Sequence, residues 1–281
     1  MVKINDTITK YLECLHLQLE RPSYNYLEQI CNAQLNTFPF ENISKLIYFR
    51  SHNYNNFEIP SFELFIKNYI ENNFGGTCYT LNSSLLILLR EIGFDCYHVM
   101  LGEEHMGIIV KIDNELFYID CGAAAPFFKP VRLDDNLDNI ASFGGDEVYI
   151  LPNEPIGNGY KYVRYINGKQ NGKTWHFYSR KEAKVSDFHD VIEKSNQSNA
   201  PFMTILRCQL YQTRKQRSVS LVNNKFSIRY SNGETSIKTL TTVEEITTVL
   251  SKEFMLLKLP VKEAIEVLKT LNIDIFAQSK N

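Results

Sequence analysis

Apolar residues recur at helical spacing through about the first ninety positions of the chain. The spacing predicts several helices there, of which the clearest runs from Cys78 to about Ile92, with Gly93 as its C′ residue. Ser61 is a possible N-cap of the helix before it. The apolar positions that follow this spacing earlier in the chain are Ile8, Tyr11, Leu12, Leu15, Leu27, Ile30, Cys31, Phe62, Phe65 and Tyr69.

The pattern then changes to short segments rich in β-branched and aromatic residues, which are typical of strands. Asp113 and Asn114 form a two-residue hairpin turn between two of them. A polar break follows around 195–201, and the last eighty residues predict three more strands and two helices, at 243–254 and 261–271. Helices, then strands, then a mixed region predict an α+β protein. The predicted strands are 96–101, 106–112, 115–120, 149–151, 160–166, 175–178, 203–211, 218–222 and 225–230.

Composition places the chain among globular proteins with a sizeable core. It has 281 residues, of which 44% are hydrophobic and 22% charged, with a net charge of −2. This balance gives no attraction to phosphate backbones, so we expect no nucleic-acid partner. The densest apolar run, 85–89, is far shorter than the about 20 residues that span a membrane. Residues 1–6 lack the apolar stretch of a signal peptide, so we expect a cytoplasmic protein with no membrane contact.

Cys78 is the first candidate for chemistry among six scattered cysteines, which we expect to be free thiols. It follows Gly75 and Gly76 and begins the predicted helix. The positive end of the helix dipole and the unpaired N–H groups favour a thiolate there. A buried, inert cysteine beside a Gly-Gly turn is the alternative interpretation.

The predicted hairpin brings a histidine and an aspartate together. With Asp113 and Asn114 as its loop, paired positions sum to 227, so that Ile112 opposes Glu115 and His105 opposes position 122. Asp120 then leaves the strand on the same face as His105, at a diagonal position within reach of a hydrogen bond. An aspartate holding one imidazole nitrogen leaves the other to take a thiol proton. A surface His–Asp pair remains the alternative, and the pairing does not place Cys78 beside them.

Other candidates are weaker. Cys96, His98, His105 and Cys121 have no spacing typical of a zinc module, so we expect no metal. His98 lacks an acid in the hairpin register and is more typical of a strand position. Trp175, on a predicted strand, favours a core position over a ligand platform.

These residues together resemble the arylamine N-acetyltransferase family, over nearly the whole chain. The family's Arg-Gly-Gly-x-Cys motif reads Phe74-Gly75-Gly76-Thr77-Cys78, and its His-Met and Asp-x-Gly motifs are His105-Met106 and Asp120-Cys121-Gly122. Its Pro-Phe-Glu-Asn segment is Pro39-Phe40-Glu41-Asn42, and Asn82 also matches. Further similarity covers 198–202, 244–245 and 254–260.

The resemblance implies an N-terminal helical bundle (1–92), a central antiparallel β-barrel with a connecting segment (93–200) and a C-terminal α/β lid (201–281). It implies a papain-like triad in which Cys78 is the nucleophile, His105 its base and Asp120 the residue that orients His105. The implied reaction moves an acetyl group from acetyl-coenzyme A to an arylamine or arylhydrazine in two steps, with no bound cofactor. The side chains implied to line the substrate pocket are Phe40, Ala123, Phe127 and Phe202.

Three departures from the family pattern bear on these expectations. Phe74 replaces the motif arginine that binds the acid matching Glu41, so Glu41 must find another partner or face solvent. Thr80 stands where the family has an acidic or polar residue, and Ala123 stands where many members have an aromatic one. Another acyl or amide-forming transfer, a thiol hydrolase and a non-catalytic homologue therefore remain alternatives, and the sequence leaves a monomer and a homodimer open.

Overall fold

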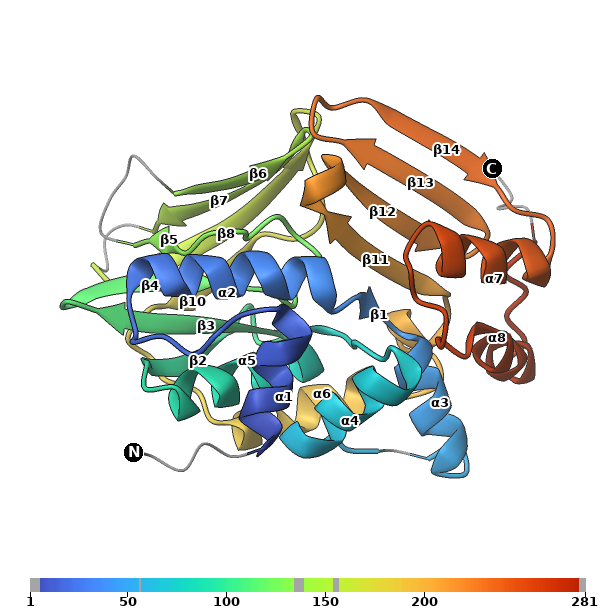
Figure 1. The fold of residues 1–281 in the computed structure, drawn as a ribbon, viewed down its shortest axis with the longest axis horizontal. Helices are drawn as coiled ribbons and strands as arrows, with labels where there is room; N and C mark the ends of the chain where they lie inside the picture. The colour runs from blue at the N-terminus through green and yellow to red at the C-terminus, as the bar shows by residue number, and fades with distance from the viewer. Residues whose placement is uncertain (1–5, 56, 134–138, 154–156, 278–281) are drawn as a thin grey trace.

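The computed structural model describes residues 6–55, 57–133, 139–153 and 157–277 (Figure 1). Residues 1–5, on which the expectation about a signal peptide partly rests, lie outside these ranges. Helices dominate the first part of the chain, as the spacing predicts. They are α1 (Asp6–Leu15), α2 (Tyr24–Thr37), α3 (Ile43–Ser51), α4 (Phe62–Asn72) and α5 (Cys78–Glu91).

The ends of these helices follow the local sequence. Ser61 caps α4, and its side chain accepts a hydrogen bond from the Leu64 N–H at 3.3 Å. Helix α5 begins at Cys78 and ends at Glu91, and Gly93 takes the positive φ of 100° that a C′ glycine supplies. The predicted cap at Ser61 and the predicted helix from Cys78 with Gly93 as its C′ residue are both confirmed.

The middle of the chain forms two antiparallel sheets. The first has the order β2-β3-β4-β5 and the second the order β10-β8-β7-β6, with β9 on β8. The strands of the first are β2 (Asp95–Leu101), β3 (His105–Ile112), β4 (Glu115–Ile119) and β5 (Val131–Arg132). Those of the second are β6 (Ile140–Phe143), β7 (Asp146–Pro152), β8 (Gly159–Ile166), β9 (Lys169–Gln170) and β10 (Trp175–Tyr178).

The prediction of a β-barrel is wrong in one respect, because the strands within the described ranges do not close into a continuous ladder. Strand β10 lies beside β2, and the contact includes a bond from Gly102 N to the carbonyl of His176 at 3.0 Å. The two sheets instead pack face to face over a shared core. Alternation along single strands gives the buried face but carries no information about closure.

The C-terminal part is a sheet covered by helices (Figure 1). Its order is β1-β11-β12-β13-β14, so β1 (Phe40–Glu41) from the helical part joins the edge of this sheet. One face packs on the two last helices. Its other elements are β11 (Arg207–Gln212), β12 (Arg217–Val222), β13 (Lys225–Tyr230), β14 (Thr235–Thr239), α7 (Val243–Lys252) and α8 (Val261–Thr270). The predicted strand at 203–211 begins later, because Pro201 opens a 3-10 turn, Pro201–Met203.

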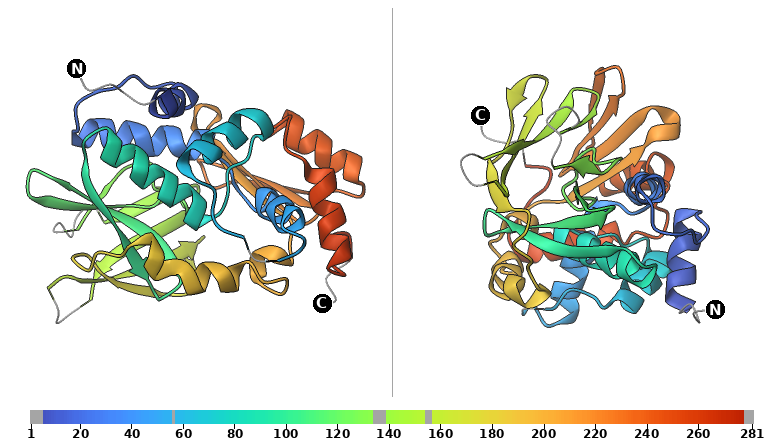
Figure 2. Two further views of the ribbon diagram at one scale, coloured as in Figure 1. Left: turned by 90° about the horizontal axis from the view of Figure 1, so that it is seen from below. Right: turned by 90° about the vertical axis from the view of Figure 1, so that its left-hand side faces the viewer.

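The first sheet is buried on both faces. Ile108 and Val110 belong to the core that α1, α2, α4 and α5 share, and Ile109 belongs to the core between the two sheets. A connecting segment with the 3-10 turn Val185–Phe188 and helix α6 (His189–Ser195) runs beside α5 and α3 (Figure 2). No helix of the described residues is long and apolar enough to cross a membrane. All six cysteines are free, as predicted.

Candidate active site

Cys78 begins α5 directly after a tight loop. Thr77 is the N-cap of α5, but its side chain accepts no hydrogen bond from the N–H groups of the first turn. Gly76 has a φ of 142°, and a Cβ there would lie 2.7 Å from the Cβ of Thr80. The loop therefore requires glycine, and it presents a partly exposed Cys78 at the positive end of the helix.

The hairpin has the predicted register. Its paired positions run from Ile112 opposite Glu115 to Ile108 opposite Ile119, and Asp113 and Asn114 have the positive φ values, 50° and 66°, of a two-residue turn. Beyond the last pair, His105 Nε2 lies 2.6 Å from Asp120 Oδ2. Both side chains are buried. The predicted His–Asp pair is therefore present in the structure.

The Asp120 carboxylate is held by three further donors. Oδ2 also accepts from the Tyr118 hydroxyl at 2.8 Å. Oδ1 accepts from Asn82 Nδ2 at 2.8 Å and from the Gly122 N–H at 3.1 Å. Together these bonds fix the direction of the carboxylate toward the imidazole. Tyr118 was missed in the sequence, although strand alternation puts it on the face of Asp120, two residues away.

Cys78 adjoins this pair. A Cβ on Gly122 would lie 2.7 Å from the Cα of Cys78, so the strand end touches the start of α5. Cys78 also contributes to the raised pKa of His105. Since Nε2 faces Asp120, Nδ1 is the nitrogen left for the sulfur. The structure therefore places Cys78 beside the end of the hairpin that carries His105 and Asp120, which the hairpin register alone did not do.

The electrostatics of the pair favour a protonated His105. Burial lowers the pKa of His105, but the charge and hydrogen bond of Asp120, together with the influence of Cys78, outweigh it and raise the pKa to about 10. His105 is then an imidazolium at neutral pH, next to a sulfur at a helix N-terminus. This arrangement suits a thiolate–imidazolium pair, which is a competent nucleophile toward a thioester.

Trp175 of β10 stacks on His105. Their ring centroids are 4.5 Å apart, and the planes are 7° from parallel. The indole N–H donates to Glu104 Oε1 at 2.8 Å, which fixes the ring. An indole face stabilises a cation, so this ring favours the imidazolium. The sequence prediction of a core position for Trp175 missed this contact, because no local pattern links residue 175 to residue 105.

The departure at Phe74 leaves Glu41 buried rather than exposed. The Glu41 carboxylate accepts from the Ser44 N–H at 2.8 Å, the Ser44 hydroxyl at 2.6 Å and the Gly75 N–H at 3.0 Å. Burial raises the pKa of Glu41 to about 7 against these bonds. Phe74 packs edge-on against Tyr48, with centroids 5.8 Å apart. Glu41 thus ties α3 to the cysteine loop, and it does so without a cationic partner among the residues that the structure describes.

The four residues implied to line a substrate pocket lie in two places. Phe40 and Phe202 meet edge to face, with centroids 5.4 Å apart, and Phe40 also bridges to Gly76 in the cysteine loop. Ala123 follows Gly122 and is partly buried. Phe127 is fully buried between Tyr118 and Tyr162 in the core of the two sheets.

The competing candidates do not join the site. His98 is buried, its Nδ1 lies 3.3 Å from the Gly107 carbonyl, and burial lowers its pKa to about 4. The residues that the structure describes contain no group of three or more His, Cys, Asp or Glu that could hold a metal.

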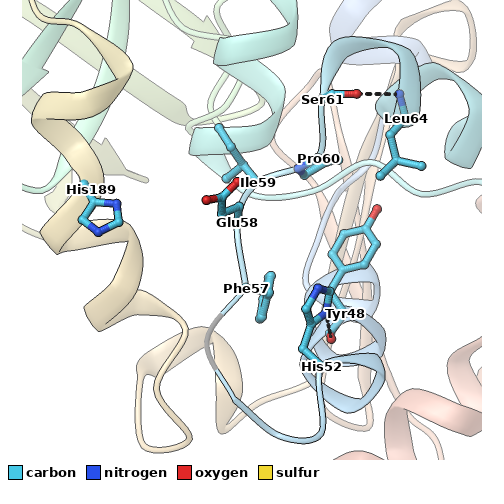
Figure 3. A pocket seen from close by; sticks show the side chains of 9 residues that line it. All are labelled: Tyr48, His52, Phe57, Glu58, Ile59, Pro60, Ser61, Leu64 and His189. Atoms are coloured by element: carbon cyan, nitrogen blue, oxygen red, sulfur yellow. Dashed lines mark hydrogen bonds between the residues drawn. The ribbon is translucent and has the colours of Figure 1, made fainter.

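A pocket of about 600 Å³ lies between α3, α4 and α6, and Cys78 is not among its lining residues. Ile59 is shared, since it lines this pocket and packs against the cluster that contains Cys78. Figure 3 shows the 57–60 segment between His189 of α6 on one side and Tyr48 with His52 on the other. The lining residues are Tyr48, His52, Phe57, Glu58, Ile59, Pro60, Ser61, Leu64 and His189.

A model of the N-acetyltransferase family matches residues 23–263. The chain belongs to this family. It is therefore an acetyltransferase, as its resemblance predicts. A search of curated protein sequences finds no match to this N-acetyltransferase.

Solved structures share the fold at low sequence identity. An arylamine N-acetyltransferase from Salmonella typhimurium is 17% identical, with a TM-score of 0.78 over 95% of this chain and 99% of that one. A Mycobacterium marinum arylamine N-acetyltransferase in complex with CoA is 15% identical, with a TM-score of 0.74 over 94% and 97%. A Bacillus cereus arylamine N-acetyltransferase with a unique Cys-His-Glu catalytic triad is 20% identical, with a TM-score of 0.70 over 89% and 98%.

Proposed function

We propose that this N-acetyltransferase moves an acetyl group from acetyl-coenzyme A to an arylamine or arylhydrazine nitrogen, through an acetyl thioester on Cys78. Cys78 is the nucleophile, His105 moves the proton and Asp120 orients His105. The observation that carries the proposal is the buried His105–Asp120 bond of 2.6 Å beside a cysteine at a helix N-terminus. The complex of the Mycobacterium marinum relative with CoA supports the choice of donor.

The chemistry takes two balanced steps. The Cys78 thiolate attacks the thioester carbonyl, and the coenzyme A sulfur leaves with the proton of His105. The amine then attacks the acetyl-cysteine, neutral His105 accepts the amine proton, and the Cys78 thiolate leaves. Asp120 remains a carboxylate throughout, held by its four hydrogen bonds.

The finer organisation belongs to the same proposal. The helical part (1–92) supplies the nucleophile, the region 93–200 supplies His105 and Asp120, and the region 201–281 acts as the lid. The reaction takes place in the cytoplasm, and the protein is a monomer or a homodimer. Phe40, Phe202 and Ala123 contact the acceptor, while Phe127 supports the segment after Ala123 from the core of the two sheets.

Initial-rate kinetics test the two-step scheme. Varying acetyl-coenzyme A at several fixed concentrations of an aromatic amine should give parallel double-reciprocal lines. Intersecting lines would contradict a free acyl-enzyme. Coenzyme A release that does not respond to the amine would instead support a thiol hydrolase on the same scaffold. A panel of acyl-coenzyme A donors against one amine separates acetyl transfer from other acyl chemistry.

A further inference from the structure

The backbone carbonyl of Ala124 is held by side chains from two different sheets. It accepts from Arg164 Nη2 at 2.9 Å and from Gln209 Nε2 at 3.0 Å. Arg164 belongs to β8 of the second sheet and Gln209 to β11 of the C-terminal sheet, and these two sheets lie side by side (Figure 1). Ala124 lies two residues after Gly122, which touches the start of α5 at Cys78. The two sheets therefore meet on the segment that leads away from the proposed nucleophile.

Ala124 has a backbone conformation that alanine rarely takes. Its φ is 51°, in the left-handed region where the Cβ is crowded by the backbone. The residue is buried, so an unpaired carbonyl there would be unfavourable. The two donors satisfy this carbonyl and hold the residue against its own backbone preference. Without one of them, the segment is free to relax toward a more ordinary conformation.

Both donors are fixed by other polar groups before they reach the carbonyl. Arg207 Nη2 donates to Gln209 Oε1 at 2.6 Å, so the NH2 end of the Gln209 amide faces Ala124. On the other side, the Arg164 guanidinium donates from two nitrogens to the two oxygens of the Asp146 carboxylate. Bonds to charged groups are stronger and more directional than neutral ones, so the two donors are already aimed at the carbonyl.

The residue between these fixed points is Ala123. Before it, the Gly122 N–H donates to Asp120 Oδ1 at 3.1 Å. After it, Ala124 is held by its carbonyl, and Phe127 is fully buried in the core of the two sheets. The direction in which Ala123 faces therefore depends on the left-handed conformation of Ala124.

We propose that Gln209 and Arg164 are positioning residues for the acceptor, which hold Ala123 in place through the carbonyl of Ala124. The proposal rests on the proposed function, since it takes Cys78 as the acetyl carrier and Ala123 as part of the acceptor wall. In a two-step reaction the amine meets this wall only after coenzyme A has given up the acetyl group. Loosening the wall should therefore slow the second step more than the first.

The experiment compares the two half-reactions in variants of Gln209. Single-turnover release of coenzyme A measures acetylation of Cys78, and kcat/KM for p-toluidine measures transfer to an aromatic amine. Gln209→Met keeps the length of the side chain but removes the donor. We expect kcat/KM for the amine to fall about three- to tenfold, the effect of losing one neutral hydrogen bond. The rate of acetylation should fall much less. Gln18→Met, at an exposed position after α1, is the matched control.

Two further variants isolate the bond to Ala124. In Gln209→Glu the carboxylate still accepts from Arg207, but it has no hydrogen to donate to the Ala124 carbonyl and repels it. The fall in kcat/KM for the amine should be at least as large as in Gln209→Met. Arg164→Lys keeps a positive charge for Asp146, but it lacks the planar fork that serves the carboxylate and the carbonyl together. Its effect should have the same direction.

The outcomes separate this proposal from the function on which it rests. An unchanged kcat/KM for the amine in Gln209→Met, or equal falls in both half-reactions, would overturn the positioning role. A fall in Gln209→Met that is absent in Gln209→Glu would also overturn it, because the effect would then come through Arg207. A wild type that forms no acetyl-Cys78, or whose acetyl-Cys78 does not react with the amine, would contradict the proposed function instead. If neither Gln209 variant folds, Arg164→Lys decides by the same comparison of half-reactions.

Discussion

The indole of Trp175 lies flat on the imidazole of His105, with the ring centroids 4.5 Å apart. It covers one face of the ring whose edge joins Asp120. Because an aromatic face attracts a cation, the stack adds to the effect of Asp120 on the protonation of His105. The ring also replaces water on that face.

We expect Trp175→Leu to lower kcat/KM for acetyl transfer by about two- to thirtyfold, which corresponds to about 0.5–2 kcal/mol of lost cation–π stabilisation. The alkylation profile of Cys78 should move to higher pH in the same variant. Trp175→Phe keeps an aromatic face and should lie between Trp175→Leu and the wild type. Equal kinetics in all three proteins would mean that the stack is only packing.

Glu41 should make stability depend on pH. Its pKa is raised from 4.5 to about 7 by burial, so between these values the folded protein binds a proton that the unfolded chain does not. The contribution of Glu41 to stability is then fully present below about pH 4.5 and lost as pH rises through about 7. Glu41→Gln should remove this loss.

Urea unfolding at pH 5 and pH 8 measures this loss of stability. From pH 5 to pH 8, the free energy of unfolding of Glu41→Gln should rise by about 1–3 kcal/mol relative to that of the wild type. Asn42→Asp is not a suitable control, because Asn42 bonds to the carbonyls of Phe202 and Ile205. Glu63→Gln, at an exposed position on α4, is the matched control. The same difference from the wild type at both pH values would contradict the buried, protonated acid.

Ala123 should affect the choice of acceptor. It follows Gly122, which contacts Cys78, and it stands where the family resemblance has an aromatic residue. Ala123→Phe should therefore change the ranking among aromatic amines more than the rate at which Cys78 is acetylated. Competition between pairs of amines measures the ranking, and single-turnover release of coenzyme A measures acetylation. An unchanged ranking would place this segment away from the acceptor.

The donor should bind partly through charge. Coenzyme A is a polyanion, and the Arg207 guanidinium bonds only to neutral side chains, Gln209 and Ser220, among those described. Gln209 in turn donates to the Ala124 carbonyl, next to Ala123. We expect the KM for donor to rise with salt while the KM for a neutral amine changes little. Arg207→Ala should reduce this salt effect, whereas equal responses of both KM values would contradict it.

Local pattern was enough to predict the hairpin and the start of α5. The alternation in β3 and β4 and the turn at Asp113 and Asn114 fix the register, and the register brings His105 to Asp120. Gly93 and Ser61 likewise mark helix ends through their own backbone and side-chain chemistry. These features depend on residues that are close in sequence or paired through a short loop.

The rest of the site depends on contacts between distant segments. Trp175 reaches His105 because β10 lies beside β2, and Gln209 reaches Ala124 across 85 positions of sequence. Neither contact has a periodic signal. The same limit explains the wrong expectation of a closed barrel, since closure depends on how the two sheets meet.

The central claim is that Cys78 carries the acetyl group between the two substrates. Mass spectrometry of the intact protein and its peptides, after incubation with acetyl-coenzyme A and no amine, tests this most directly. The account predicts one acetyl group per chain, on Cys78, which an aromatic amine then removes and which Cys78→Ser does not accumulate as a thioester. Acetylation at another cysteine, or none with intact donor, would contradict it.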